Sequence, residues 1–370
     1  MRVLMLCKAC VVGTYQRKLE EIARHADVEL CVLVPPHWHD AARGTLPLER
    51  VHTAGYTLRV TPVRFNGNFH LHYFPRFGAE LRAFRPQIVH IDEEPYNLAT
   101  WHALWHARKA GARTLFFSWQ NIARRYPPPF RWAEAWVLRH VDYALMGTQS
   151  AAEVWRAKGY SGPLAVVPQF GVDPQIFAPP QTPRAPDVPT VGFVGRLVEE
   201  KGGVDLLHAL AQVRAPWRLA VVGKGPHEPV LRSLAEQLGV VERVHFTALP
   251  STAMPDFYRR IDVLAVPSRT RPNWKEQFGR VIVEAMACGV PVVGSDSGAI
   301  PDVIDGAGLI FAEGDVQALA AHLQTLLADP AQRHVLGARG RERVLAHFTQ
   351  AQIAAQTVAV YREMLRDGSP

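Results

Sequence analysis

Short apolar segments alternate along the chain with longer stretches in which apolar residues recur at helical spacing. In the first half, runs rich in Val, Ile and Leu occur at Val3–Leu6, Val28–Val34, Ile88–Ile91, Thr114–Phe117 and Tyr143–Met146. Continuous apolar runs of this length are typical of strands that are buried on both faces of a parallel sheet. The intervening segments have the pattern of helices, as in Tyr15–His25, Leu98–Ala110 and Pro129–His140. The first half therefore predicts a doubly wound α/β domain.

The second half repeats this alternation after a proline-rich segment. Six prolines between Pro174 and Pro189 indicate a linker. Further strands are predicted at Val191–Gly195, Leu219–Val222, Val244–Thr247, Val263–Val266, Val292–Gly294 and Leu309–Phe311. A helical pattern closes the chain at Thr349–Leu365. We expect two tandem α/β domains that face each other across a central cleft, where a ligand would bind.

Composition narrows the class of protein. With 48% hydrophobic and 20% charged residues, the 370-residue chain is not collagen-like, coiled-coil or largely disordered. No stretch approaches 18 uncharged apolar residues, so no transmembrane helix is predicted. The N-terminal apolar run is interrupted at Lys8, which favours a buried strand over a signal peptide. We expect a cytoplasmic protein.

The net charge of +7 lies entirely in the first half of the chain. Residues 1–175 contain 21 Lys and Arg against 14 Asp and Glu, whereas residues 176–370 contain 20 of each kind. A basic half suggests an anionic surface nearby, such as lipid headgroups or an anionic substrate. Nucleic acid is disfavoured as a partner because the chain has no recognised nucleic-acid-binding module. A solvated basic face explains the charge equally well, so peripheral contact with the inner face of the membrane stays an open alternative.

Four cysteines do not make a disulfide framework in a chain of this length. Cys7 and Cys10 form a C-x-x-C motif, but a metal site would require a second ligand pair, and only His37 and His39 lie nearby in sequence. Thioredoxin-like chemistry would require the motif to open a helix, whereas this one follows a strand. We therefore interpret both cysteines as small buried thiols without a function and expect no metal site.

Three segments of the second half combine glycine with charge or follow a strand. Gly195–Gly202 carries two cations, Arg196 and Lys201, directly after a predicted strand. Val222–Pro226 is a second glycine turn at the end of a strand, and Gly294–Pro301 is a Gly- and Ser-rich turn after another. Glycine allows a ligand to approach the backbone closely. Taken singly, the two cations of Gly195–Gly202 are explained as solvated charges, and Val222–Pro226 is explained at least as well as a tight turn.

A fourth segment, Glu276–Pro291, indicates a ligand site more specifically than the other three. Gly279 begins a largely apolar helix, and the free amide groups of a helix start favour an anion. Glu284 is the only charged residue between Val281 and Gly289, and a buried carboxylate costs several kcal/mol unless it is hydrogen-bonded. It either makes a structural hydrogen bond to a neighbouring turn or accepts hydrogen bonds from the hydroxyls of a ribose. Glu276 is placed to reach a second set of ligand hydroxyls.

Glu276 and Glu284 form an E-x7-E motif within EQFGRVIVEAMACGVPVVGSDSGAIPDVI. With GFVGRLVEEKG and VVGKGP, this stretch resembles the donor domain of family 4 glycosyltransferases over about 160 residues. The resemblance implies a GT-B fold and retaining transfer of a sugar from a nucleotide-sugar, with no essential metal and no cofactor. It also implies an acceptor-binding domain over residues 1–175, a donor-binding domain over residues 190–345, and a helix over residues 346–370 that packs back on the first domain.

The same resemblance assigns roles in the donor site. Arg196 and Lys201 match residues that neutralise the departing phosphate, Glu276 matches the residue that orients the donor sugar, and Glu284 matches the one that holds the ribose. These four residues therefore serve as donor-site candidates, the first three of them catalytic. The predicted donor-binding positions are Gly13, Gly195, Gly223, Phe246, Ala248, Leu249, Gln277, Phe278, Gly279, Arg280 and Glu284.

The acceptor side departs from the family pattern. Many members have a histidine at two strand tips, where this chain has Asp92 and then Trp119 or Gln120. Asp92 and Glu93 are candidates for binding acceptor hydroxyls, and Asp92 is also a candidate catalytic proton acceptor. Alternatively, the three consecutive acids that begin at Asp92 form a solvated face. We expect His90, inside the preceding strand, to be packed and hydrogen-bonded.

Arg124–Trp132 combines arginines with aromatic residues and three prolines. One interpretation is an acceptor lip that contacts a lipid headgroup or a sugar phosphate. The other is a proline-stiffened loop that leads into a core helix.

The resemblance therefore implies a hexosyltransferase-type glycosyltransferase of polysaccharide biosynthesis, acting on a glycan, lipid-linked or small-molecule acceptor with retention of configuration. The alternative is a sugar-nucleotide epimerase or hydrolase on the same fold. A nicotinamide dehydrogenase is disfavoured because neither domain has G-x-G-x-x-G after its first strand. A non-catalytic binding protein would be expected to have lost Arg196, Lys201 or Glu276.

Overall fold

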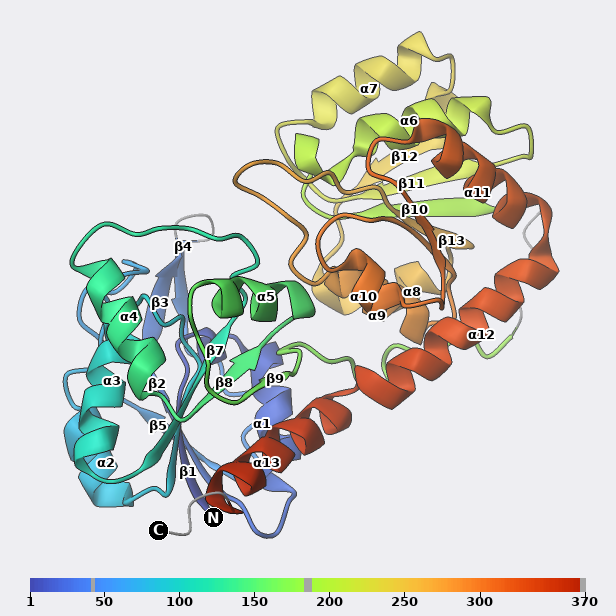
Figure 1. The fold of residues 1–370 in the computed structure, drawn as a ribbon. Helices are drawn as coiled ribbons and strands as arrows, with labels where there is room; N and C mark the ends of the chain where they lie inside the picture. The colour runs from blue at the N-terminus through green and yellow to red at the C-terminus, as the bar shows by residue number, and fades with distance from the viewer. Residues whose placement is uncertain (41–43, 183–187, 367–370) are drawn as a thin grey trace. The chain divides into compact units, whose positions relative to one another are not determined.

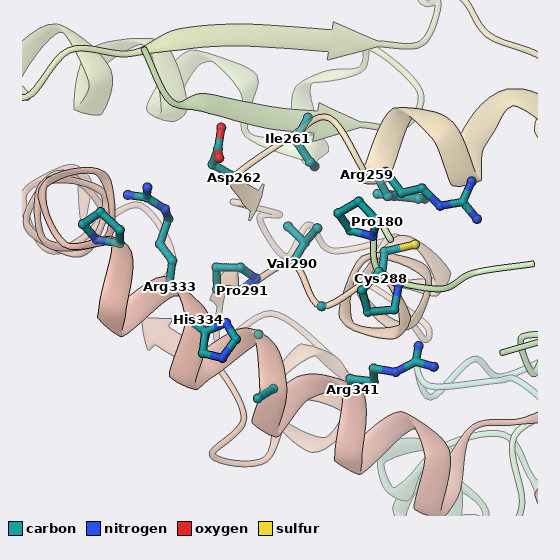
Figure 2. A pocket seen from close by; sticks show the side chains of 16 residues that line it. Pro180, Arg259, Ile261, Asp262, Cys288, Val290, Pro291, Arg333, His334 and Arg341 are labelled. Atoms are coloured by element: carbon teal, nitrogen blue, oxygen red, sulfur yellow. The ribbon is translucent and has the colours of Figure 1, made fainter. Parts of the chain in front are cut away.

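The computed structural model describes residues 1–40, 44–182 and 188–366, and its chain divides into two compact units (Figure 1). Unit 1 consists of Met1–Gly171 together with Gln350–Pro370, and unit 2 consists of Val172–Thr349. The proline-rich segment Pro174–Pro189 therefore belongs to unit 2. Its residues 183–187 lie outside the described part of the chain.

Unit 1 is built on a seven-stranded parallel sheet in the order β5-β2-β1-β6-β7-β8-β9. Its strands are β1 (Arg2–Leu6), β2 (Glu29–Val34), β5 (Thr57–Val60), β6 (Ile88–Ile91), β7 (Arg113–Ser118), β8 (Tyr143–Met146) and β9 (Leu164–Val166). A separate antiparallel pair joins β3 (His37–Asp40) to β4 (Gly44–Pro47). The helices of unit 1 are α1 (Arg17–Ala23), α2 (Phe77–Phe84), α3 (Leu98–Lys109), α4 (Phe130–His140), α5 (Gln149–Ala157) and α13 (Gln350–Arg366).

Helices cover both faces of this sheet because alternate residues of each strand point to opposite sides. Val3 and Met5 of β1 belong to a core formed with α1 and α13. Leu4 and Leu6 of the same strand belong to a second core, which is formed with α2, α3, α4 and α5. The final helix of the chain thus completes one face of the first sheet, where it lies beside α1 (Figure 1).

Unit 2 has a six-stranded parallel sheet in the order β12-β11-β10-β13-β14-β15. The strands are β10 (Thr190–Val194), β11 (Arg218–Val222), β12 (Val244–Thr247), β13 (Val263–Val266), β14 (Val292–Ser295) and β15 (Leu309–Phe311). The helices are α6 (Gly203–Gln212), α7 (Glu228–Gln237), α8 (Met254–Tyr258), α9 (Arg280–Ala287), α10 (Ile300–Ile304), α11 (Val316–Ala328) and α12 (Pro330–His347). One core packs the sheet against α6, α7 and α11.

Small residues allow α12 to pack closely against α9 and the turn that follows it. A Cβ atom on Gly337 would lie 2.0 Å from the carbonyl oxygen of Gly289, and one on Gly340 would lie 3.0 Å from the side chain of Met286. Any larger residue at Gly337 would force the two backbones apart. This contact covers part of unit 2 with the helix that precedes α13.

The eleven strands predicted from the apolar runs are all present, each within one residue of the predicted ends. The predicted doubly wound α/β architecture is therefore confirmed for both units. The strands β3, β4, β5 and β9 were not predicted, because their residues are mostly half-buried or exposed and they lack a continuous apolar run. Across the three described ranges, no helix is both long enough and apolar enough to cross a membrane.

His90 confirms the expectation of a packed histidine. It is buried within β6, and its Nδ1 lies 2.6 Å from the hydroxyl of Tyr361 on α13. Burial lowers the pKa of His90 well below its usual value, so the ring is neutral. A buried polar contact of this kind helps to specify where the final helix packs.

The Tyr361→Phe substitution should destabilise unit 1 by about 1–2 kcal/mol, because His90 Nδ1 would be left buried without its partner. The matched control is Tyr143→Phe, which removes a 3.1 Å hydrogen bond to Glu363 of the same helix. Glu363 is exposed, so water can replace the lost hydroxyl and the effect should be smaller. Urea unfolding of both variants measures the difference, and equal losses would contradict the assigned role of the buried contact.

Candidate active site

The strand order of each sheet identifies where a ligand site is expected. In unit 1 the chain winds outward through β2 and β5 and then returns to the other side of β1 at β6. In unit 2 it winds outward through β11 and β12 and returns at β13, beside β10. Ligands of open α/β sheets bind at the carboxyl ends of the strands beside such a reversal. The loops after β1 and β6, and those after β10 and β13, are therefore the candidate positions.

Two glycines bring the loops after β10 and β11 into direct backbone contact. The Gly195 amide donates to the carbonyl of Val222 at 3.0 Å. Gly223 has φ +153°, and a Cβ atom there would lie only 1.8 Å from the carbonyl oxygen of Gly195. An open cavity of about 510 Å³ lies beside this contact. Its lining includes Gly195, Gly223, Lys224, Ala248 and Leu249.

Phe246, predicted to border the same site, is placed differently from Ala248 and Leu249. Its ring packs against the core of unit 2 and lies beneath the guanidinium of Arg232, at 4.2 Å. It is not part of the lining of the cavity. Its contribution to a donor site stays a prediction.

An ion pair joins the loops after β10 and β13. Lys201 Nζ lies 2.5 Å from Glu276 Oε2, which also accepts a 3.0 Å hydrogen bond from Ser268 Oγ. The ammonium group of Lys201 additionally lies 4.9 Å from the ring centre of Trp274. Glu276 is buried, so these donors offset the loss of its hydration. Two residues that are 75 positions apart in sequence are thus held together.

The turn after β14 closes the same region. Ala299 donates its amide to the carbonyl of Glu276 at 3.1 Å, and a Cβ atom on Gly298 would lie 2.2 Å from that carbonyl oxygen. The four segments singled out in the sequence therefore meet at one edge of the unit 2 sheet. Arg196 lies at this edge with its side chain 68% exposed, and its closest ionic partner, Glu200, is 4.0 Å away.

Helix α9 begins at Arg280, after Gly279 in the left-handed conformation, and no side chain caps its first turn. Gln277 and Arg280 are exposed, whereas Phe278 is buried with its ring 5.8 Å from that of Phe348. Only the backbone of Phe278 is therefore suited to contact a ligand at the helix start. The first-turn amides and the helix dipole give this point a positive potential.

Glu284 lies one turn further along α9 and is buried. Its Oε1 accepts a hydrogen bond from Arg280 Nε at 2.8 Å, and its Oε2 accepts one from the hydroxyl of Tyr258 at 2.9 Å. Burial and the neighbouring Glu284 raise the pKa of Tyr258 well above its usual value, so Tyr258 remains a donor. The structural hydrogen bond anticipated for Glu284 is present, and its contact with a ribose stays a prediction.

In unit 1, Asp92 and Glu93 follow β6 and are both buried. Asp92 Oδ1 accepts from Gln169 Nε2 at 2.7 Å, and Asp92 Oδ2 accepts from the Cys7 thiol at 3.0 Å. The alternative that the acids form a solvated face is therefore wrong. Both oxygens of Asp92 already have a donor, which constrains any role in binding an acceptor.

The pKa values of Glu93 and its neighbour Glu94 are shifted in opposite directions. Burial opposes ionisation of Glu93, but the ion pair with Lys8 and the nearby His72 ring prevail and lower its pKa to about 2. Burial raises the pKa of Glu94 to about 7, although Ser118 Oγ and the Trp119 amide donate to it. The carboxyl end of β6 thus holds one firmly ionised group beside one that titrates near neutrality.

The other predicted positions of unit 1 are occupied by protein contacts. Trp119 donates its indole N–H to Gln169 Oε1 at 2.9 Å and stacks on Phe170, while Gln120 is buried. The amide of Gly13 donates to Glu49 Oε2 at 2.6 Å. Since this amide binds a carboxylate oxygen, it is able to donate to an anionic group. Its contact with a donor phosphate stays a prediction.

Several residues around these sites were not identified from the sequence. Ser268, Trp274 and Tyr258 complete the surroundings of Glu276 and Glu284, but each belongs to no motif that the sequence reveals. Lys8 had a usable signal, because a cation directly after a buried strand lies at the carboxyl edge of the sheet.

Comparison with known proteins places the chain in a family. Residues 175–343 match the family described as glycosyl transferases group 1. A GDP-mannose-dependent alpha-(1-6)-phosphatidylinositol monomannoside mannosyltransferase from Mycolicibacterium smegmatis is 35% identical over 261 residues, which cover 65% of this chain and 68% of that protein. The lipopolysaccharide core biosynthesis mannosyltransferase LpsB from Rhizobium meliloti is 33% identical over 216 residues, covering 53% of this chain and 60% of that protein.

Solved structures agree at the level of the fold. Sucrose-phosphate synthase from Thermosynechococcus elongatus matches the whole of both chains with a TM-score of 0.72 and 22% identity. HepE from Anabaena, solved in complex with UDP, matches 98% of this chain and 100% of its own with a TM-score of 0.73 and 19% identity. The fold is therefore the GT-B type, with two α/β domains that each contain a parallel sheet. The chain belongs to the group 1 glycosyl transferases, the family 4 type of glycosyltransferase.

Replacing Gly223 with alanine should destabilise the protein by about 3 kcal/mol and weaken nucleotide binding, because the new methyl group overlaps the Gly195 carbonyl. Gly239→Ala is the matched control. Gly239 also has a positive φ, +68°, but nothing lies within 4 Å of the added Cβ, so about 1 kcal/mol is expected. Urea unfolding compares the two, and equal effects would show that the close approach is not what constrains Gly223.

Proposed function

We propose that this protein transfers a mannosyl group from GDP-mannose to a lipid-linked or glycan acceptor, with retention of anomeric configuration and without a metal ion at the donor diphosphate. The observation that carries the proposal is the meeting of four segments around Lys201 and Glu276 at the carboxyl edge of the unit 2 sheet. The choice of donor is supported by relatives whose names specify GDP-mannose. Because the matches cover only 52–68% of the first relatives' lengths, their substrates are carried over as proposals.

The site supplies what departure of a nucleoside diphosphate requires. In the reaction, the bond between C1 of the sugar and the β-phosphate oxygen breaks, and its electron pair stays with the phosphate. Arg196, Lys201 and the first turn of α9 place positive charge where this negative charge develops. Lys201 is paired with Glu276, so the diphosphate would compete with Glu276 for this ammonium group.

Retention is assigned to attack by the acceptor hydroxyl on the face of the sugar from which the phosphate leaves. The acceptor oxygen bonds to C1, and its proton passes to the departing phosphate oxygen, so all atoms and charges are accounted for. No protein nucleophile takes part in this scheme. Glu276 orients the sugar through its hydroxyls, and Glu284 holds the ribose, for which its present hydrogen bonds to Arg280 and Tyr258 would rearrange.

Thermal unfolding with GDP-mannose and with UDP-, ADP- and dTDP-sugars tests the donor. GDP-mannose at about 100 times its dissociation constant should add about 3 kcal/mol of stability, equally with and without EDTA. A shift with a UDP-sugar alone would refute the proposed donor. An EDTA-sensitive shift would refute metal independence at the diphosphate.

Replacing Arg196 with alanine should lower kcat/KM by about 100-fold, because transition-state charge would lose a preorganised cation. Arg214→Ala is the matched control, since Arg214 is equally exposed but precedes β11 at the opposite edge of the sheet.

An α-mannoside product, identified by NMR, is expected for retention, and a β-mannoside would exclude it. Release of free mannose without an acceptor would favour the sugar-nucleotide hydrolase instead.

Peripheral membrane contact is the second part of the proposal. The named acceptor of the first relative is a phosphatidylinositol glycolipid. In unit 1, α3 and α4 pack together and carry exposed tryptophans, Trp105 at 46% and Trp132 at 68% exposure. Arg124, Arg125 and Arg131 are exposed beside Trp132 in sequence. Exposed tryptophan flanked by arginine suits the interface of an anionic bilayer.

The protein should sediment with phosphatidylglycerol vesicles at low ionic strength and be released at high ionic strength, but not with phosphatidylcholine vesicles. Trp132→Ala should reduce the bound fraction severalfold. Val230→Ala, which removes an exposed apolar side chain from unit 2, should leave it unchanged. Binding that ignores salt and lipid charge, or that both variants reduce equally, would refute this surface.

A further inference from the structure

The C-x-x-C motif acquires a third partner in the folded chain. The ligand atoms of Cys7, Cys10 and Asp92 all lie within 4.8 Å of one another, and the Cys7 thiol donates to Asp92 Oδ2 at 3.0 Å. All three side chains are more than nine-tenths buried. Within residues 1–40, 44–182 and 188–366, this is the one group of three or more metal-ligand side chains that lie so close together.

The fold explains why these residues meet. Leu6 of β1 is paired with Ile91 of β6 in parallel register, so Cys7 and Asp92 are the next residues at the carboxyl ends of adjacent strands. After Cys7 the chain turns into a short 3-10 helix, Ala9–Val11, which returns Cys10 toward Cys7. Gln16 Nε2 donates to the carbonyl of Cys10 at 2.9 Å and fixes this turn. The cluster therefore lies where the strand order of unit 1 reverses.

The oxygens of Asp92 accept hydrogen bonds from neutral donors, Cys7 and Gln169, rather than from cations. Lys8, the nearest lysine in sequence, is paired with Glu93. Asp92 makes no ion pair with any residue in the described part of the chain. A buried carboxylate beside two thiols is a costly arrangement unless a cation or shared protons offset it.

The surroundings orient the carboxylate as they do in established metal centres. Gln169 Nε2 donates to Asp92 Oδ1 at 2.7 Å, which leaves Oδ2 directed at the sulfur of Cys7. Gln169 is itself held by Trp119, whose indole N–H donates to Gln169 Oε1 at 2.9 Å. A hydrogen bond to the far oxygen of a ligating carboxylate is the usual outer support of a bound metal.

We propose that Cys7, Cys10 and Asp92 bind a thiophilic divalent cation of the zinc type in unit 1. Two thiolates and one carboxylate are a ligand set that favours zinc, and three protein ligands leave a fourth position for water or another ligand. Zinc–sulfur distances of about 2.3 Å would draw the ligand atoms to within roughly 4 Å of each other. On binding, the two thiols release two protons, and both sulfurs and Asp92 Oδ2 coordinate the cation.

This site goes beyond the proposed glycosyl transfer, and its three ligands belong to unit 1, whereas Lys201 and Glu276 belong to unit 2. Its test therefore uses metal binding and requires no substrate. Co²⁺ serves as a spectroscopic substitute for Zn²⁺, because thiolate ligation gives it a charge-transfer absorption in the near ultraviolet. The full-length protein is reduced, stripped with a chelator under argon and titrated with Co²⁺ and then with Zn²⁺.

The expected result is one equivalent of Co²⁺ with thiolate charge-transfer absorption that Zn²⁺ abolishes. Cys7→Ser and Cys10→Ser should each remove this absorption, while Cys31→Ser and Cys288→Ser should retain it. These two controls are also buried free cysteines, so they match the loss of a buried thiol. Gln169→Ala should weaken Co²⁺ binding about ten-fold, because it removes only the outer support.

Asp92→Asn keeps the shape of the side chain and both thiols, so it remains informative if a serine variant unfolds. It should weaken Co²⁺ binding and lower the molar absorption change without abolishing thiolate ligation entirely. No charge-transfer absorption in the wild-type protein with intact thiols would overturn the proposal. Equal loss in the Cys288→Ser control, or a Cys7–Cys10 disulfide that persists after reduction, would overturn it as well.

Discussion

Parallel pairing is the constraint on which the arrangement of both candidate sites depends. Because neighbouring strands run in the same direction, the chain must cross back along the sheet between them, in most cases through a helix. Every strand of a sheet consequently ends at the same edge, and residues distant in sequence become neighbours there. Lys201 and Glu276 meet for this reason, and so do Cys7 and Asp92. Reversal of the strand order then leaves a gap between diverging loops where a ligand can enter.

Buried carboxylates make these edges chemically specific. Glu276, Glu284 and Glu93 are each buried, and each has its own set of donors. A buried ion pair is a weak source of stability, because desolvation of its two charges offsets most of their attraction. Removing one partner, however, leaves an unpaired charge in the interior, which is costly. A ligand that enters such a site must therefore replace the donor it displaces. A diphosphate that attracts Lys201 would release Glu276 to accept hydroxyl groups of the sugar, so both charges would remain paired.

The sequence predicted those elements whose burial produces a continuous apolar run, and those parts of the site whose residues form a contiguous motif. All strands with continuous apolar runs were predicted, as were the four segments that meet around Glu276. The edge strand β5 and the pair β3–β4 were not predicted from the sequence, because a strand outside the core needs no apolar run. The burial of the acids after β6 was not predictable from the sequence either. Three acids in a row are consistent with an exposed loop, and only the fold brings Lys8, His72 and Gln169 around them.

Asp92 is a candidate for two roles, metal ligand and general base, and the conflict between them bears directly on the mechanism. A general base must have a free oxygen that can take a proton, whereas Asp92 has one oxygen bonded to Gln169 and the other directed at Cys7. A cation at Oδ2 would lower its basicity further, so metal binding and proton abstraction by this group exclude each other. The proposed front-face scheme would remove the conflict, because in it the acceptor proton passes to the departing phosphate. Under that proposal unit 1 would need no protein base at Asp92, and the carboxylate would be available as a metal ligand at the carboxyl end of β6.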